Sequence, residues 1–290
     1  MSAAEIHARQ AHRVPILERI DDLPSLPSTY LRAREAMDDP NGSLETLAQI
    51  IGTDPAMSAR ILRVANSALY GLLTRVDSVW RALSIIGVAE TRNLILATAV
   101  ISAFKDLPLG AVSMRSFWEH SVACGVAART IARRMHLSSP ERFYLAGLLH
   151  DIGRLCLFIL EPVSMSTALQ AHRERQGPLH DIETQLFATD HAAVGAALLR
   201  HWGIPDTFCV AAETHHLSQD SEPACTETAL THVADVIVNS LRIGTSGTRW
   251  VPQLSDRAWR MTELTTSDLP DIVETSISTA RDVTSAFLEH

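Results

Sequence analysis

Segments in which apolar residues recur every three or four positions run through most of this 290-residue chain. That spacing places apolar side chains on one face of an α-helix, whereas a half-buried strand needs apolar and polar residues to alternate. No stretch of the sequence sustains such alternation. The sequence therefore predicts an all-α protein, folded as a multi-helical bundle without significant sheet.

Several of these segments carry helix start and stop signals. Asp54-Pro55 indicates an N-cap followed by proline at the first helical position, and Ser139-Pro140 repeats the pair. Asp190 can cap a helix that ends at Gly203-Ile204-Pro205. We expect further helices over residues 44–51, 79–86, 90–103, 116–135, 206–215, 229–241 and 270–287.

Two breaks divide the chain into segments. Residues 105–110 contain proline and glycine and separate an N-terminal helical lobe from a histidine-rich lobe. The polar residues 244–255 separate this second lobe from a closing helical segment. We expect an N-terminal extension over 1–22 and one module over 23–290, divided into lobes 23–110 and 111–243 and a closing segment 244–290.

Charge and cysteine usage limit the partners and the compartment. The net charge of −8 gives an acidic surface that repels nucleic-acid phosphates and anionic lipids, so neither nucleic acid nor a membrane is an expected partner. The four cysteines form no C-x-x-C pair, which indicates a reducing compartment. The N-terminus lacks the apolar core of a signal peptide, and the longest uncharged apolar run, 94–104, is too short to span a bilayer. We therefore expect a cytoplasmic protein.

Histidine and aspartate residues within the apolar helices form a candidate metal site. Imidazole nitrogen suits zinc, iron, nickel and copper, and carboxylate oxygen suits harder cations. A mixed set with a bridging carboxylate can hold two divalent ions roughly 3.5–4 Å apart, which polarise a phosphoryl group and activate water. The candidate ligands are His120, His150, Asp151, His191, His215, His216 and Asp235.

The same residues have a structural interpretation. A single histidine on an amphipathic helix is usually solvated or hydrogen-bonded. The adjacent pair His150-Asp151 lies in an apolar run, and Asp235 lies among apolar neighbours, so these groups need internal partners. Spacing alone supports the metal site and the structural interpretation equally. The structural interpretation is the default for His7, His12, His136, His172, His180, His201, His232 and His290.

Short motifs in both lobes resemble the HDOD branch of the HD-domain superfamily. In the first lobe these are Leu23-Pro24-Ser25-Leu26-Pro27, the Asp54-Pro55 helix start, and the stretches 64–71 and 82–87. In the second lobe they are residues 191–195 and Trp202-Gly203-Ile204-Pro205. The resemblance covers roughly residues 23–241. It implies an HD-like helical core with an N-terminal helical lobe, and a signalling or regulatory role in bacteria.

The resemblance also implies a metal-ligand set. The H…HD…D pattern of HD-type phosphohydrolases falls on His120, His150-Asp151 and Asp235, and the added His191 and His215-His216 resemble the larger set of the HD-GYP cyclic di-GMP phosphodiesterases. By this analogy one ion uses the first four residues, and a second ion shares Asp151 with the three added histidines. A divalent transition metal is implied, with iron favoured and zinc, manganese or nickel as alternatives.

Two features depart from the HD-GYP pattern. No Gly-Tyr-Pro segment follows His215-His216, and Arg154 stands where those enzymes generally have lysine. Arg154 is a candidate phosphate contact because guanidinium can hold phosphate through two hydrogen bonds, and the alternative is a solvated helix residue. Asn66, Ser67 and Tyr70 either contact the second lobe or a partner, or mark a helix end with Gly71 as its C-cap.

We therefore expect a metal-bearing signalling module that acts through a signalling protein partner or a nucleotide ligand, without robust catalysis. The alternative is a metal-dependent phosphohydrolase acting on a cyclic dinucleotide or a nucleotide. A third class is a structural metal site that only holds the bundle together.

Overall fold

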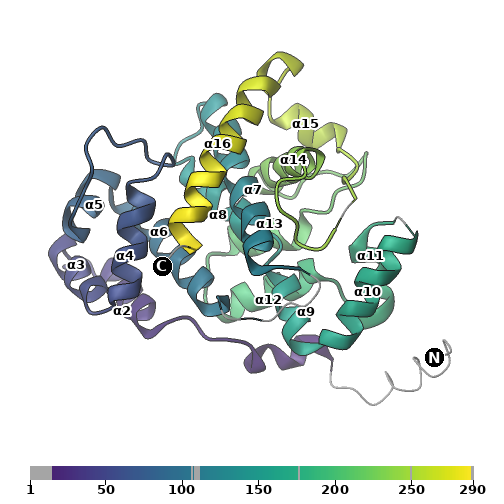
Figure 1. The fold of residues 1–290 in the computed structure, drawn as a ribbon, viewed down its shortest axis with the longest axis horizontal. Coiled ribbons are helices and arrows are strands. Elements are labelled where there is room, and N and C mark those ends of the chain that lie inside the picture. The colour runs from purple at the N-terminus through teal and green to yellow at the C-terminus, as the bar shows by residue number, and fades with distance from the viewer. Residues whose placement is uncertain (1–14, 106, 108–111, 176, 249, 289–290) are drawn as a thin grey trace.

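A computed structural model describes residues 15–105, 107, 112–175, 177–248 and 250–288 (Figure 1). Within these residues every regular element is a helix and no strand occurs. The predicted all-α bundle is confirmed. The predicted break at 105–110 lies mostly outside the described residues, as does most of the predicted extension 1–22.

The first lobe is a group of short helices at the purple-to-blue end of Figure 1. Several begin with a side-chain cap, and Ser43, Asp54 and Ser78 each accept a hydrogen bond from a backbone N–H in the first turn. The elements are α2 (Ser28–Asp38), α3 (Leu44–Gly52), α4 (Pro55–Ala65), α5 (Val79–Ile86) and α6 (Val88–Phe104). The preceding η1 (Ile16–Asp22) packs against the second lobe.

The second lobe is built around a long buried helix, α7 (Met114–Arg134), which packs against α8 (Glu141–Leu149) and α14 (Thr226–Leu241). A second set of packed helices places α12 (His191–His201) against α9 (Ile152–Leu160) and α13 (Asp206–Thr214). The remaining helices of this lobe are α10 (Pro162–Arg175) and α11 (Leu179–Phe187).

The chain closes with α15 (Asp256–Met261), η2 (Thr266–Asp268) and α16 (Leu269–Leu288). Helix α16, yellow in Figure 1, packs against both α7 and α4. Arg60 and Arg63 of α4 donate to the backbone oxygens of Phe287 and Ala286, at 2.8 and 3.0 Å. These bonds use carbonyls that a helix end leaves without helical partners, so α16 joins the two lobes.

Two of the three predicted N-caps are confirmed. Asp54 accepts from the Met57 N–H and Asp190 accepts from the Ala193 N–H. The prediction for Ser139-Pro140 is wrong, because Ser139 has a left-handed φ of 51° and Pro140 takes the N-cap position without a side-chain hydrogen bond. A left-handed residue cannot hold the extended backbone that an N-cap side chain needs to reach the first turn.

The end of α4 also differs from the prediction that Gly71 caps it. The helix ends at Ala65 with Asn66 as its C-cap, and the Asn66 amide donates to the carbonyls of Leu62 and Val76, both at 2.8 Å. Tyr70 instead faces the second lobe, where the Arg129 guanidinium lies 5.9 Å from its ring centroid. The helix-end alternative holds for Asn66, although Gly71 is not the cap, and the contact of Tyr70 with the second lobe is also confirmed.

Helices α9 and α12 approach each other at two glycines. A Cβ atom added at Gly153 would lie 1.9 Å from the His191 carbonyl oxygen, and one at Gly195 would lie 3.0 Å from the Gly153 nitrogen. Only glycine permits backbones to come this close. The contact sets the first turn of α9 directly against the first residue of α12.

One helical stretch, Glu141–Leu160, has the length and apolar composition of a membrane span, and 94% of that window is buried inside the protein. It includes α8, α9 and the break between them. Burial of this kind is typical of a core helix.

Candidate metal centre

The structure brings all seven predicted ligand residues together in the second lobe. Six of them are buried and His216 is half-buried. They come from helices that are far apart in the sequence: His120 from α7, His150 and Asp151 from the break between α8 and α9, His191 from α12, His215 and His216 from the end of α13, and Asp235 from α14.

Asp151 lies at the middle of this cluster. Its Oδ2 lies 3.3 Å from His150 Nε2 and 3.6 Å from His120 Nε2. Its Oδ1 lies 3.0 Å from His191 Nε2 and 3.7 Å from His215 Nε2. The two carboxylate oxygens therefore face different histidines. We call the two sides the Asp235 half (His120, His150 and Asp235) and the His191 half (His191, His215 and His216).

The Asp235 half combines imidazole and carboxylate groups. Asp235 Oδ1 lies 3.1 Å from His120 Nε2 and 3.6 Å from His150 Nε2, and it accepts a 2.7 Å hydrogen bond from Asn239. Cys124 Sγ lies beside this half, 3.6 Å from His120 Nε2 and 3.8 Å from Asp235 Oδ1. Sequence reasoning missed Cys124 and Asn239, although each stands four residues after a candidate ligand and hence on the same helix face.

The His191 half contains imidazole donors only. His191 Nε2 and His216 Nε2 lie 2.9 Å apart, so the two atoms cannot both carry a proton. The His216 ring stacks on His180, with centroids 4.0 Å apart, and Glu183 Oε2 lies 2.5 Å from His191 Nδ1. Glu183 was also missed. The sequence feature that could have identified Glu183 is its position as an acidic residue on the apolar face of α11, which Leu179 and Ile182 define.

Hydrogen bonds on the far side of several rings orient them toward the cluster. His150 Nδ1 lies 2.7 Å from the Gly147 carbonyl, and His215 Nδ1 lies 2.8 Å from the Ala212 carbonyl. A carbonyl only accepts, so each Nδ1 is the donor, and in the neutral ring, the form that binds metal, each Nε2 presents a lone pair inward. His150 Nε2, His215 Nε2 and Asp151 Oδ1 are buried without a hydrogen-bond partner. Buried acceptors that converge in this way fit a bound cation.

The charges within the cluster are strongly coupled. Burial lowers the pKa of His150, but the carboxylates of Asp151 and Asp235 outweigh it and raise that pKa to about 10. Burial and the neighbouring charge of His150 hold the pKa of His215 well below its ordinary value. Burial, with Asp235 and Asp151, raises the pKa of the Cys124 thiol well above its ordinary value.

Arg154 points into the cluster, and the interpretation as a solvated residue is wrong. Its side chain is buried because the Gly153 contact holds this turn of α9 against α12. Its Nη1 donates to Ser246 Oγ at 2.6 Å, and its Nη2 lies 3.3 Å from His191 Nε2. The Nε atom lies 3.4 Å from Asp151 Oδ1.

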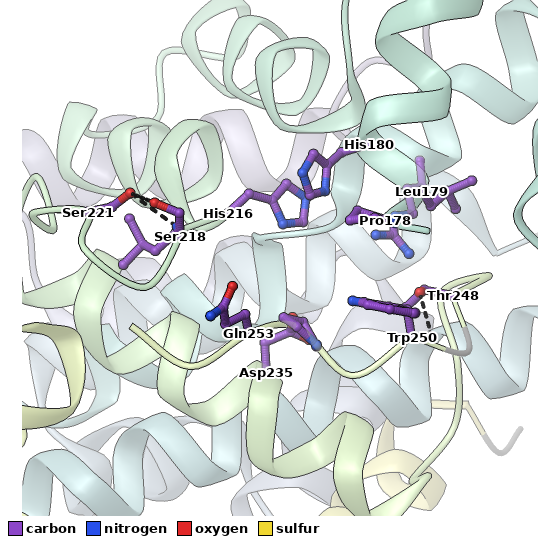
Figure 2. Close-up of a pocket in the computed structure, with 13 residues that line it drawn as sticks. Pro178, Leu179, His180, His216, Ser218, Ser221, Asp235, Thr248, Trp250 and Gln253 are labelled. Carbon is purple, nitrogen blue, oxygen red and sulfur yellow. Dashed lines mark hydrogen bonds between the residues drawn. The ribbon is translucent and has the colours of Figure 1, made fainter. Parts of the chain in front are cut away.

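A cavity of about 370 Å³ opens beside the cluster (Figure 2). That volume lies at the lower end of the range for small-molecule sites. Each half of the cluster reaches the cavity through one residue, Asp235 and His216, and Arg154 also lines it. The rings of His180 and His216 lie together on one side in Figure 2. The rest of the lining includes Ser218, Ser221, Thr248, Trp250 and Gln253.

The all-helical fold and the buried histidine and aspartate cluster define a helical domain with a candidate metal centre. A family model described as the HDOD domain matches residues 23–218, which is more than half of the chain. The chain therefore belongs to the HDOD family. A relative from Treponema pallidum (strain Nichols), called an uncharacterized protein, is 27% identical over 202 residues, or 69% of this chain. The chain spans 39% of the length of that curated relative.

Solved structures share the fold. An HDOD domain protein with unknown function from Geobacter sulfurreducens has a TM-score of 0.76 at 24% identity, with 98% of both chains covered. A candidate phosphohydrolase from Shewanella amazonensis SB2B has a TM-score of 0.70 at 20% identity, covering 94% of this chain and 99% of that one. A candidate signal transduction protein from Marinobacter aquaeolei VT8 has a TM-score of 0.72 at 20% identity, covering 98% of this chain and 65% of that one. At these identities the likeness shows the fold alone.

Proposed function

We propose that this HDOD protein is a signalling module whose HD-type centre holds one or two divalent transition-metal ions through the seven clustered residues. The observation that carries the proposal is the position of Asp151. Its two oxygens face two separate sets of buried imidazole nitrogens, which is the arrangement of a carboxylate that bridges two ions. The unpartnered Nε2 atoms of His150 and His215 support the same proposal.

In this proposal the Asp235 half holds one ion and the His191 half holds the other, with Asp151 shared. A bound divalent ion would polarise a phosphoryl oxygen and lower the pKa of a coordinated water. Iron is the favoured ion because imidazole and carboxylate donors are mixed, and zinc, manganese and nickel are alternatives.

The cavity is the proposed site of a phosphate-bearing ligand, such as a nucleotide. Arg154 lies at its wall beside the cluster, and guanidinium can donate two parallel hydrogen bonds to a phosphate. When an ion takes the lone pair of His191 Nε2, the nearby Nη2 of Arg154 loses that acceptor and becomes free to donate into the cavity. Trp250, with 40% of its surface exposed, offers an indole face for a planar ring.

The biological setting belongs to the same proposal. We propose a bacterial, cytoplasmic protein that signals through a protein partner or the bound ligand, without nucleic acid or a membrane as partner, because the net charge is −8. We also propose lobes 23–110 and 111–243 with a closing segment 244–290, of which α16 is the part that contacts both lobes.

Elemental analysis of protein purified without added metal tests the proposal. We expect one to two equivalents of a transition metal per chain in wild type, and a large loss in Asp151→Ala. A matched control is Asp181→Ala, which removes an exposed carboxylate outside the cluster. If wild-type protein binds less than one equivalent both as purified and after refilling with each candidate ion, the ligand assignment is wrong.

A second candidate is a phosphohydrolase acting on a cyclic dinucleotide or a nucleotide. The cavity beside the cluster favours it. The nearby acidic groups also favour it, because they are paired with arginines and so repel a phosphate less: Glu222 contacts Arg257, and Glu227 lies 3.0 Å from Arg142. We still expect weak or absent hydrolysis of cyclic di-GMP, because no Gly-Tyr-Pro segment follows His216. Turnover of roughly 1 per second or more by metal-replete protein, abolished in His150→Ala, would make this candidate the leading one.

A further inference from the structure

Cys124 is placed unlike an ordinary buried helix cysteine. A cysteine in a helix commonly donates to the carbonyl four residues earlier, as Cys156 does to Ile152 at 3.5 Å. The residue four positions before Cys124 is His120, and Cys124 Sγ lies against the His120 ring nitrogen instead of the carbonyl. Its other near neighbour is the Asp235 carboxylate of a different helix. The thiol therefore faces polar donor atoms although its side chain is fully buried.

The separations between these atoms lie within about 0.2 Å of those expected between ligand atoms of one metal ion. A metal–sulfur bond of about 2.3 Å and metal–nitrogen or metal–oxygen bonds of about 2.0–2.2 Å set donor atoms about 3.3–3.7 Å apart at tetrahedral angles. Cys124 Sγ lies 3.6 Å from His120 Nε2 and 3.8 Å from Asp235 Oδ1. His120 Nε2 lies 3.1 Å from Asp235 Oδ1.

A second observation points to a ligand at the same place. The Nε2 atom of His150 is buried and has no hydrogen-bond partner. One donor atom from each of His120, Cys124, His150 and Asp235 lies within 4.8 Å of all the others. Four donors from three helical segments thus lie close together, and one of them makes no hydrogen bond.

The charge of the centre favours a fourth anionic group. Two divalent ions would bring four positive charges, and the buried Arg154 beside them adds a fifth. Asp151, Asp235 and the buried Glu183 beside His191 supply only three negative charges. Buried charge without compensation is costly, so a thiolate beside one of the ions would lower the energy of the loaded state.

We infer that Cys124 is a thiolate ligand of the ion in the Asp235 half, beside His120, His150, Asp235 and the shared Asp151. The inference rests on the proposed function, since it needs a metal ion in that half. On binding, the sulfur forms a bond to the metal and the thiol proton leaves to solvent. A thiolate makes this half softer than an imidazole and carboxylate site, so zinc or ferrous iron should bind in preference to manganese.

Cobalt(II) is the probe for the test, because a thiolate bound to cobalt gives a charge-transfer band in the near ultraviolet that imidazole and carboxylate do not give. Metal-free wild-type protein is titrated with cobalt while the spectrum and the bound metal are both measured. We expect a band of the intensity of one thiolate. In Cys124→Ser the band should disappear, and zinc affinity should fall by roughly 10-fold or more while manganese affinity changes less.

The matched control is Cys225→Ser, which changes a half-buried cysteine that caps α14 into another capping residue. It should keep the band. Wild-type protein that binds cobalt without the band overturns the inference and leaves the metal centre intact. A band that persists in Cys124→Ser also overturns it. Wild-type protein that binds no cobalt overturns both the inference and the proposed function. The wild-type spectrum decides the matter even if Cys124→Ser does not fold, and Cys124→Ala is a second variant.

Discussion

The two halves of the candidate metal centre share Asp151 but differ in their donors and their surroundings. The Asp235 half lies among α7, α8 and α14 and combines imidazole, carboxylate and a neighbouring thiol. The His191 half contains three imidazoles, and the groups beside it are Glu183, Arg154 and the His180 ring. One is a mixed site among α7, α8 and α14, and the other is a nitrogen site, and each reaches the cavity through one residue.

This difference separates two tasks in the proposed centre. The Asp235 half draws ligands from packed core helices, so its occupation should be coupled to folding. The His191 half lies beside Arg154 and next to the cavity through His216, so its occupation should be coupled to ligand binding. The carboxylate of Asp151 links the two, and each half can be changed separately.

The largest effect is expected when the shared group is removed. Asp151→Ala takes a ligand from both halves, so the affinity for each ion should fall by roughly 100-fold or more. His191→Ala takes a ligand from one half, so one ion should remain. Elemental analysis and thermal unfolding of both variants measure this. Equal metal content and equal stability in the two variants would rule out a shared, binuclear arrangement.

Removing one imidazole from each half should next separate their roles in folding. In metal-free protein His120→Ala leaves the buried Asp235 carboxylate with one partner fewer, which should cost about 3 kcal/mol of unfolding free energy. His216→Ala removes a half-buried ring and should cost about 1 kcal/mol. Denaturant unfolding with a chelator present compares them. A larger loss of unfolding free energy in His216→Ala would mean that the His191 half, and not the Asp235 half, is the one coupled to folding.

His150 in one half and His215 and His216 in the other should respond oppositely to pH when metal is removed, while the pKa of His191 is raised like that of His150. In the Asp235 half the pKa of His150 is raised to about 10, because the carboxylates overcome burial. Its contribution to stability is complete below the unfolded pKa of about 6.5 and is lost as the pH rises toward 10. Between pH 7 and pH 9 the loss should be on the order of 2 kcal/mol.

In the His191 half, burial and neighbouring histidines hold the pKa values of His215 and His216 well below their ordinary range. These residues stay neutral in the folded protein while the unfolded chain takes up protons below about pH 6.5, so stability falls as the pH falls. The free energy of unfolding, measured from pH 5 to pH 9.5, tests the expected loss of stability at both alkaline and acidic pH. His150→Gln should mainly reduce the loss of stability at alkaline pH, and His215→Gln should reduce part of the loss at acidic pH, which His216 also contributes.

The smallest effect is expected from the group that orients His191. Glu183→Gln keeps the shape of the side chain but weakens the bond that fixes the His191 ring, so affinity in the His191 half should fall about 10-fold. Binding in the Asp235 half should not change. Glu174→Gln, which alters an exposed carboxylate, is the control. Metal titration that shows no change in Glu183→Gln would mean that the packing of α12 alone positions the ring.

Local rules predicted much of the helical structure. The helix expected over 79–86 is Val79–Ile86, and the one expected over 116–135 is Met114–Arg134. Helices α2, α10 and α11 were not predicted, because polar residues interrupt their apolar faces. Their apolar residues become recognisable as a buried face only once the neighbouring helices are in place.

The candidate site was predictable in part. The seven ligand residues were identified from apolar context and family resemblance, and the structure brings them together, while their role as ligands stays a prediction. Cys124, Asn239 and Glu183 could have been found by examining the same helix faces. The contact of Arg154 with Ser246 could not, since it joins residues 92 positions apart whose proximity depends on how α9, α12 and α14 pack.

The close approach of α9 and α12 limits the radius of the cation that the proposed centre can hold. At Gly153 main chain lies against main chain, so no side chain between these helices can rotate or compress to change their spacing. Asp151 and His191 flank that contact, with Asp151 Oδ1 3.0 Å from His191 Nε2, and the backbones that carry them are held at a fixed spacing. A cation larger than a first-row transition metal, such as calcium with its longer bonds of about 2.3–2.6 Å, would have to push the helices apart. The two glycines would then exclude large ions by size, independently of which metal the ligand atoms favour.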